Sequence, residues 1–213
     1  MPVTAKICGI STDKALGAAI AGGASHVGFV FFAKSPRNVT VEQAAELVRQ
    51  VPGHVGRVGL FVDPDPAFVA HAMALLPLDV IQLHGNETPA LAARLRAAHG
   101  VDIWKAIPVR TRADLDAGRA FHGAATRLLY DAKPPKGAEL PGGNGLRFDW
   151  KLLDGHVHPL PWVLSGGLDA SNVGEAARIT GAQIVDISSG VESAPGTKSV
   201  DKITRFLQAV AAL

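Results

Sequence analysis

The chain has 213 residues, and its 47% hydrophobic and 19% charged residues are typical of one globular domain with a sizeable core. A formal net charge of +2, without basic runs that contain interleaved aromatic residues, argues against a nucleic-acid partner. The single cysteine, Cys8, excludes an internal disulfide and a cysteine-based zinc site and is typical of a reducing compartment.

No apolar stretch approaches the roughly 20 residues that a membrane helix needs, and the segment Met1–Cys8 lacks the basic-then-apolar form of a signal peptide. We therefore expect a cytoplasmic protein with no membrane partner.

Short apolar runs rich in β-forming residues recur along the whole chain. There are eight of them: Ala5–Ile10, His26–Phe32, Arg57–Val62, Asp79–His84, Asp102–Pro108, Arg127–Asp131, Trp162–Ser165 and Ile184–Ser188. Most are separated by segments with helical periodicity, and helix starts are legible at Ser11–Asp13, Thr40–Gln43 and Asn86–Pro89. Eight alternating strand–helix units predict an α/β fold, a (β/α)8 TIM barrel that occupies residues 1–213 as one domain.

The connection after the sixth run departs from this pattern. Residues 132–146 are rich in Gly and Pro, so we expect a long loop there, followed by a short helix near Phe148–Leu153. Long loops at the carboxyl-terminal rim of a barrel are usually functional.

Glycines follow the last two strands at the points where the chain leaves the barrel. The segments are Leu164–Leu168, which contains Gly166 and Gly167, and Asp186–Glu192, which contains Ser189 and Gly190. Glycine allows close approach of backbone N–H groups to a ligand, and a helix N-terminus adds partial positive charge. Two such loops on adjacent strands predict an anion site, most often for a phosphate, and hence a phosphorylated small-molecule ligand.

Polar residues at the carboxyl ends of barrel strands face the site, and these ends supply the candidate chemistry. Cys8 ends the first strand; it is either a small buried hydrophobe or a functional thiol, and Lys6 would favour its thiolate if the ammonium faced it. Asp131 ends the sixth strand; it is either a cap for the following loop or a carboxyl whose partial burial favours the protonated form. A thiol ready to lose a proton and a carboxyl ready to donate one form a complementary pair.

Other candidates surround this pair. Arg37 follows Ser35–Pro36 on a rim loop and suits bidentate capture of a carboxylate, although most exposed arginines are merely solvated. Gln82, His84 and Asp186 lie at strand ends and are expected to contact the ligand, with His84 as a wall residue or a structural histidine. No cluster of His, Asp and Glu shows metal-ligand spacing, so we expect no metal.

At this point the residues match a known family. The chain resembles phosphoribosylanthranilate isomerase of tryptophan biosynthesis along nearly its whole length, and the order and spacing of the matching segments carry the resemblance. These segments are Lys6–Ile10, Gly28–Phe31, Lys34–Arg37, Val58–Val62, Ile81–Gly85, Asp131–Lys133, Gly142–Gly145, Phe148–Trp150, Leu164–Leu168 and Val185–Glu192. Ser199 stands where the resemblance leads us to expect an acidic residue, which leaves the local helix cap open.

The resemblance implies an Amadori rearrangement of a phosphoribosyl aminobenzoate, without metal or organic cofactor. It assigns Cys8 as general base and Asp131 as general acid, and it directs Arg37 to the anthranilate carboxylate. Backbone N–H groups around Gly166, Gly167, Ser189 and Gly190 would hold the phosphate.

Two other functions stay open from the sequence. The isomerase of histidine biosynthesis performs the same rearrangement, but that family places an aspartate as base on the first strand. Its ligand has two phosphates and requires a second phosphate-binding pair of glycine loops, whereas this chain has one, near the seventh and eighth strands. A phosphosugar-binding barrel without turnover is the other, against which the presence of both Cys8 and Asp131 argues. The oligomeric state is not determined by the sequence, and a homodimer is compatible with a barrel of this size.

Overall fold

The computed structural model describes residues 2–138 and 140–213. Met1, at the start of the segment read for a signal peptide, and Glu139, inside the predicted loop, lie outside this description. Eight parallel strands form a closed barrel in the order β1 to β8, as the sequence predicts. The strands are β1 (Thr4–Cys8), β2 (His26–Phe31), β3 (Gly56–Phe61), β4 (Val80–Leu83), β5 (Asp102–Val109), β6 (Arg127–Ala132), β7 (Trp162–Leu164) and β8 (Ile184–Ile187).

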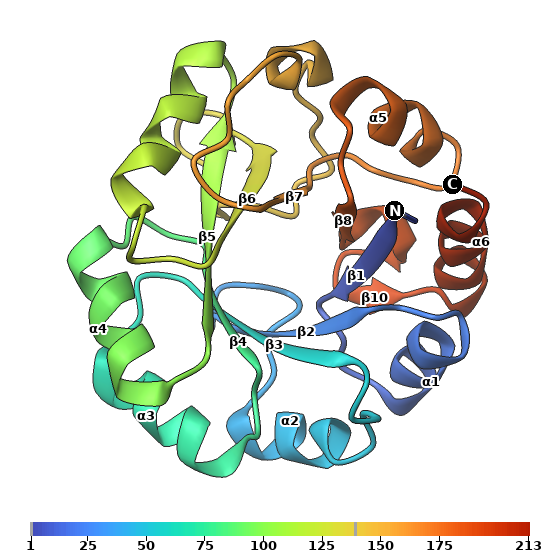
Figure 1. Ribbon diagram of the computed structural model, residues 1–213. Coiled ribbons are helices and arrows are strands. Elements are labelled where there is room, and N and C mark those ends of the chain that lie inside the picture. Colours follow the sequence, from blue (N-terminus) through green and yellow to red (C-terminus); the bar gives the residue numbers. More distant parts are fainter. Residues whose placement is uncertain (1, 139) are drawn as a thin grey trace.

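Helices surround the strands (Figure 1). They are α1 (Asp13–Ala21), α2 (Val41–Val48), α3 (Pro66–Leu75), α4 (Pro89–His99), α5 (Val173–Thr180) and α6 (Val200–Ala211). Thr12, Thr40 and Thr88 cap the first, second and fourth of these helices with their side-chain oxygens, which confirms the start signals in the sequence.

The fifth crossover is a 3-10 helix, η1 (Arg112–Phe121), where an α-helix is the usual element of such a barrel. Its buried residues are Leu115, Gly118 and Phe121, which follow one another at intervals of three. A helix with 3.0 residues per turn places residues at this spacing on one face. The three buried residues of η1 therefore all lie on one side of the helix.

The polar loop after β6 is present and ends at the short 3-10 helix η2 (Trp150–Leu153), as predicted. After β8 the chain forms a 3-10 turn, η3 (Ser189–Val191), and then a hairpin of β9 (Glu192–Ala194) and β10 (Thr197–Lys198), which the sequence reading missed. Ser199 accepts a hydrogen bond from the backbone N–H of Lys202 and caps α6, so the departure from the expected acidic residue leaves this helix start intact.

Two cores hold the barrel together. The larger core lies between the strands and the helices, and a smaller core fills the barrel interior with side chains from β3, β4, β5, β6 and β7: Val58, Val80, Trp104, Ala106, Leu129 and Val163. A third cluster of Cys8, Val30 and Leu60 borders the cavity described below. Because side chains alternate along a strand, Lys6 and Cys8 of β1 point to the same side of the sheet, into the barrel.

Candidate active site

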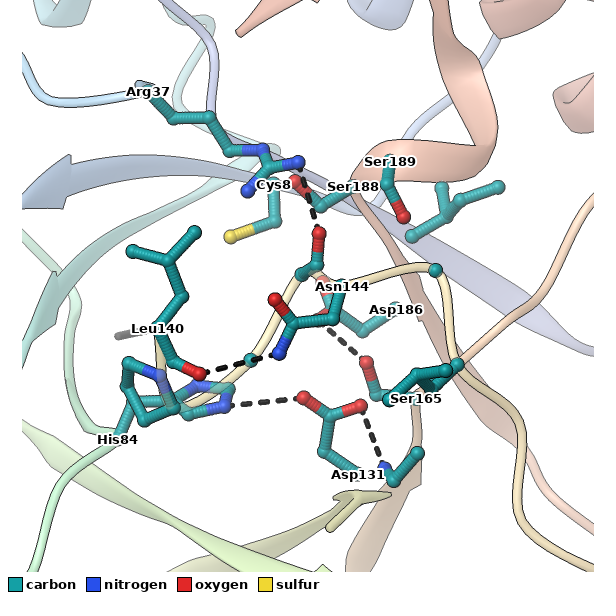
Figure 2. A pocket seen from close by; sticks show the side chains of 18 of the residues that line it. Cys8, Arg37, His84, Asp131, Leu140, Asn144, Ser165, Asp186, Ser188 and Ser189 are labelled. Atoms are coloured by element: carbon teal, nitrogen blue, oxygen red, sulfur yellow. Dashed lines mark hydrogen bonds and ion pairs between the residues drawn. The ribbon is translucent and has the colours of Figure 1, made fainter. Parts of the chain in front are cut away.

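A cavity opens at the carboxyl end of the barrel, and Figure 2 shows the side chains around it. Strand ends and the loops after β2, β6, β7 and β8 line it. Of the residues predicted for the site, nine line the cavity: Cys8, Arg37, His84, Asp131, Gly166, Gly167, Asp186, Ser189 and Gly190. Gln82 does not line it.

Cys8 lies against a strand glycine at the base of this cavity. A Cβ atom added to Gly28, its register partner on β2, would stand only 2.9 Å from Cys8 Sγ and 3.2 Å from Lys6 Cε. The glycine therefore makes room for the thiol and the lysine stem together. Cys8 is 3% exposed.

Lys6 favours the thiolate of Cys8, as the sequence predicts, but burial outweighs this effect. Burial raises the pKa of the Cys8 thiol, and the positive charge of Lys6 offsets only part of that rise. The Lys6 ammonium donates a 2.7 Å hydrogen bond to Asp186 Oδ1, and the negative charge of Asp186 adds to the rise in the pKa of Cys8. Burial alone would lower the pKa of Lys6, but Asp186 and Cys8 outweigh it and raise that pKa.

Asp186 is held on both oxygens. Besides the Lys6 ammonium on Oδ1, the Ser165 hydroxyl donates to Asp186 Oδ2 over 3.2 Å. Lys6 and Asp186 are register partners on β1 and β8, so the barrel closure itself brings the ion pair together.

Asp131 and His84 make the second contact across the cavity wall. His84 Nε2 is 3.2 Å from Asp131 Oδ2, while Asp131 Oδ1 accepts the backbone N–H of Ala132 at 2.8 Å. Gln82 Nε2 is 3.1 Å from His84 Nδ1, so Gln82 lies behind the histidine. Gln82 is thus placed to orient His84 rather than to touch a ligand directly.

Arg37 is buried rather than exposed on the rim. Its Nε and Nη2 donate to the two carboxylate oxygens of Glu192 at 2.7 and 2.8 Å, and Nη2 also donates to the Gly143 carbonyl at 3.1 Å. The bidentate edge of Arg37 therefore binds the carboxylate of Glu192 and not that of a ligand. Burial alone would raise the pKa of Glu192, but the bonds from Arg37 and the charge of Lys198 hold it below its usual range.

The glycine loops after β7 and β8 line one end of the cavity. Their neighbours leave no room for a side chain at Gly166, Gly167 or Gly190. Gly166 and Gly167 have φ of +91° and +64°, and a Cβ atom on Gly167 would stand 2.9 Å from the Leu146 carbonyl oxygen. A Cβ atom on Gly190 would collide with the Leu168 carbonyl oxygen. Packing within the protein therefore requires glycine at these positions, whether or not a ligand binds there. Asn172, which donates to the Gly167 carbonyl at 2.9 Å, follows this loop, and α5 begins at Val173.

The long loop after β6 covers part of the cavity (Figure 2). Asn144 Nδ2 donates to the Leu140 carbonyl at 3.2 Å and closes a tight bend. A Cβ atom on Gly142 would stand 2.5 Å from His84 Nε2 and 2.6 Å from Asp131 Oδ2. The loop backbone therefore packs directly on the histidine–aspartate contact.

Two absences concern the parts of the chain that the structure describes. Residues 2–138 and 140–213 contain no group of three or more His, Cys, Asp and Glu side chains arranged to bind a metal ion. None of the helices formed by these residues has the length and apolar character needed to cross a bilayer.

Comparison with known proteins decides the family. The family model described as N-(5'-phosphoribosyl)anthranilate (PRA) isomerase matches residues 5–209. The chain belongs to the phosphoribosylanthranilate isomerase family.

Individual relatives agree with this assignment. The chain is 57% identical to the N-(5'-phosphoribosyl)anthranilate isomerase of Rhodospirillum centenum, with all of both chains covered. It is 32% identical to monomers of the dimeric phosphoribosylanthranilate isomerase of Thermotoga maritima, with a TM-score of 0.85 over 99% of this chain and 100% of that one. A phosphoribosylanthranilate isomerase in complex with reduced 1-(o-carboxyphenylamino)-1-deoxyribulose 5-phosphate is also 32% identical, with a TM-score of 0.86 over the same shares.

The phosphoribosylanthranilate isomerase assignment sets aside the histidine-pathway isomerase and the non-catalytic barrel. Sequence reasoning nevertheless missed residues that organise the site, chiefly Glu192, Lys198 and Ser165. Glu192 ends one of the segments that carry the family resemblance, but nothing in that segment indicates that it pairs with Arg37. Ser165 was visible as the polar residue that ends the seventh apolar run, beside Asp186 on the next strand.

Proposed function

We propose that this chain catalyses the Amadori rearrangement of N-(5-phosphoribosyl)anthranilate to 1-(2-carboxyphenylamino)-1-deoxyribulose 5-phosphate, a step of L-tryptophan biosynthesis. The observation that carries the residue roles is that a thiol from β1 and a carboxyl from β6 line one cavity, with glycine loops at its end. Cys8 and Asp131 can transfer protons, and the backbone N–H groups of the glycine loops can bind a phosphate.

Asp131 is the general acid in this proposal. It donates its proton to the ring oxygen of the furanose, the C1′–O bond breaks, and the anthranilate nitrogen becomes a protonated Schiff base. The contact with His84 and the Ala132 N–H hold the carboxyl in place, which favours one proton-donating geometry.

Cys8 is the general base. Its thiolate removes the proton from C2′, the electron pair moves toward the Schiff-base nitrogen, and the resulting enolamine tautomerises to the ketone. The nitrogen of the substrate is the electron sink, so neither step requires a metal or an organic cofactor.

The remaining cavity residues bind the substrate. The backbone around Gly166, Gly167, Ser189 and Gly190 holds the phosphate, Arg37 faces the anthranilate carboxylate, and Asp186 and His84 contact the sugar. Gln82 supports His84 from behind. We further propose that the described barrel is a single cytoplasmic catalytic domain, where Cys8 stays reduced, and that it forms a homodimer, as the Thermotoga maritima relative does.

Two variants test the acid and base roles by the fluorescence change during turnover. Cys8→Ser leaves a group of nearly the same size whose pKa is far too high for a base, so turnover should fall by at least about 10²-fold while substrate affinity is largely kept. Asp131→Asn should lose a similar factor because an amide donates no labile proton. Near-normal turnover of Cys8→Ser would remove the thiol from the mechanism.

A further inference from the structure

Three buried charges form one group beside the cavity: Arg37, Glu192 and Lys198. Glu192 Oε1 accepts from Arg37 Nε and from Lys198 Nζ, both at 2.7 Å. The three side chains are 7%, 4% and 1% exposed, so water screens them little. Two cations and one anion leave the group with a net charge of +1.

The contacts of Lys198 fit the protonated form of its amine. Its Nζ donates to Glu192 Oε1, to the Ser188 carbonyl at 2.9 Å and to the Ser188 hydroxyl at 3.1 Å, which uses all three N–H donors of the charged form. Burial lowers the pKa of Lys198, and the adjacent Glu192 carboxylate offsets part of that effect. Lys198 does not line the cavity, so it can act on a ligand only through its neighbours.

Arg37 has one nitrogen left for a ligand. Its Nε and one N–H of Nη2 go to Glu192, and the other N–H of Nη2 goes to the Gly143 carbonyl. Within the described residues, Nη1 donates to no acceptor, and Arg37 lines the cavity. The guanidinium is therefore fixed on one edge and open on the other.

We propose that Lys198 determines the preference of the site for a carboxylated ligand, because it neutralises Glu192 and leaves the charge of Arg37 uncompensated. Without Lys198, Arg37 and Glu192 form a neutral ion pair, and a neutral pair attracts a carboxylate weakly. Lys198 is thus a positioning residue that acts through Glu192. The inference rests on the proposed role of Arg37.

The test compares two ligands that differ in one group. They are reduced 1-(2-carboxyphenylamino)-1-deoxyribulose 5-phosphate and its phenylamino counterpart, which lacks the carboxyl. Lys198→Met should weaken binding of the carboxylated ligand by about tenfold or more and binding of the other ligand by less than about threefold. KM should rise more than kcat falls. The control is Lys151→Met, which removes a positive charge from the exposed side of η2. It should leave the affinities for both ligands unchanged.

A second substitution separates charge balance from packing. Adding Glu192→Gln to Lys198→Met returns the group to a net charge of +1, so the double variant should regain most of the lost preference for the carboxylated ligand. If Lys198 only supported the local packing, removing the buried charge of Glu192 as well would weaken binding of the carboxylated ligand further. A double variant no better than Lys198→Met would overturn the proposal. Lys198→Gln, which removes the charge but can still hydrogen-bond, serves if the methionine variant does not fold.

Arg37→Met separates this inference from the function on which it rests. If Arg37→Met weakens both ligands equally, Arg37 does not read the carboxylate, and the proposed role of Arg37 fails. If Arg37→Met discriminates between the ligands and Lys198→Met does not, only the inference about Lys198 fails.

Discussion

At the scale of one residue, burial of Cys8 opposes the base role proposed for it until a substrate binds. Burial raises the pKa of this thiol, so the thiol form is favoured in the free enzyme. In the proposed reaction, ring opening creates a protonated Schiff base, a full positive charge, beside C2′. A cation close to Cys8 favours its thiolate, so this intermediate would activate the proposed base that removes its C2′ proton.

A separation of two pH profiles follows. If Cys8 is the base, the acidic limb of kcat/KM reports Cys8 in the free enzyme, and that of kcat reports it in the bound states, which include the ring-opened cation. Because burial raises the pKa of Cys8 and the substrate cation lowers it again, the limb of kcat/KM should lie at higher pH than the limb of kcat. Steady-state kinetics across pH, with the alkylation rate of this only cysteine as a second readout for the free enzyme, measures both. Coincident limbs, or the reverse order, would contradict this account.

At the scale of one element, the loop after β6 packs its backbone against the proposed acid. Gly142 permits this approach because a Cβ atom there would stand 2.5 Å from His84 Nε2 and 2.6 Å from Asp131 Oδ2. Neither atom lies on a flexible side-chain end that can move aside freely, because each is hydrogen-bonded to the other.

Gly142→Ala should therefore reduce turnover by roughly tenfold with little loss of global stability, since the loop can shift outward but the acid loses its cover. Gly53→Ala is the matched control, because nothing lies within 4 Å of a Cβ atom at that glycine. Kinetics together with thermal unfolding of both variants checks the expectation. Unchanged turnover in Gly142→Ala would show that contact between this loop and the acid is dispensable.

Elements differ in how far the sequence predicts them. The eight strands are predictable because each is a short apolar run between polar crossovers, and the capped helix starts carry their own signals at Thr12, Thr40 and Thr88. The hairpin β9–β10 is not, because its strands have three and two residues and no apolar alternation. The end of β1 at Cys8 rather than Ile10 depends on the positive φ of Gly9, which packs against Arg37.

The candidate site divides in the same way. Cys8, Asp131 and Arg37 are recognisable from the sequence because their residue types and motifs are distinctive. Their partners are not, since Glu192 meets Arg37 across 155 positions of sequence and the contact exists only once the barrel closes. The ion pair of Lys6 is hidden in the sequence for the same reason, because its partner Asp186 comes from the last strand.

At the scale of the whole molecule, burial at the end of the barrel opposite the cavity disfavours the charged form of a histidine. His26 begins β2 and packs on Trp104 of the inner core, with ring centroids 5.0 Å apart. Ser25 Oγ lies 3.0 Å from its Nδ1. Burial, together with the charges of Lys6 and Arg127, lowers the pKa of His26 from 6.5 to about 4.

This shift makes the folded protein sensitive to mild acid. Between about 4 and 6.5 the unfolded chain binds a proton at His26 that the native state does not, so the free energy of unfolding falls as pH drops through that range. His158, which stacks on Trp162 and whose pKa burial lowers to about 4, adds to the same slope. Above pH 6.5 neither histidine contributes to the slope.

His26→Phe should therefore flatten the dependence of the unfolding free energy on pH, because phenylalanine keeps an aromatic ring against Trp104 and has no proton to bind. Denaturant unfolding between about pH 5 and 7 is the measurement, since most carboxylates are ionised in both states there and add little slope. His122→Phe, at an exposed position, is the control and should leave the slope unchanged. Since the loss of one buried histidine removes only part of the effect, the slope should fall without vanishing and should fall further in a variant that also carries His158→Phe. An unchanged slope in His26→Phe would mean that the native barrel admits the charged His26 ring.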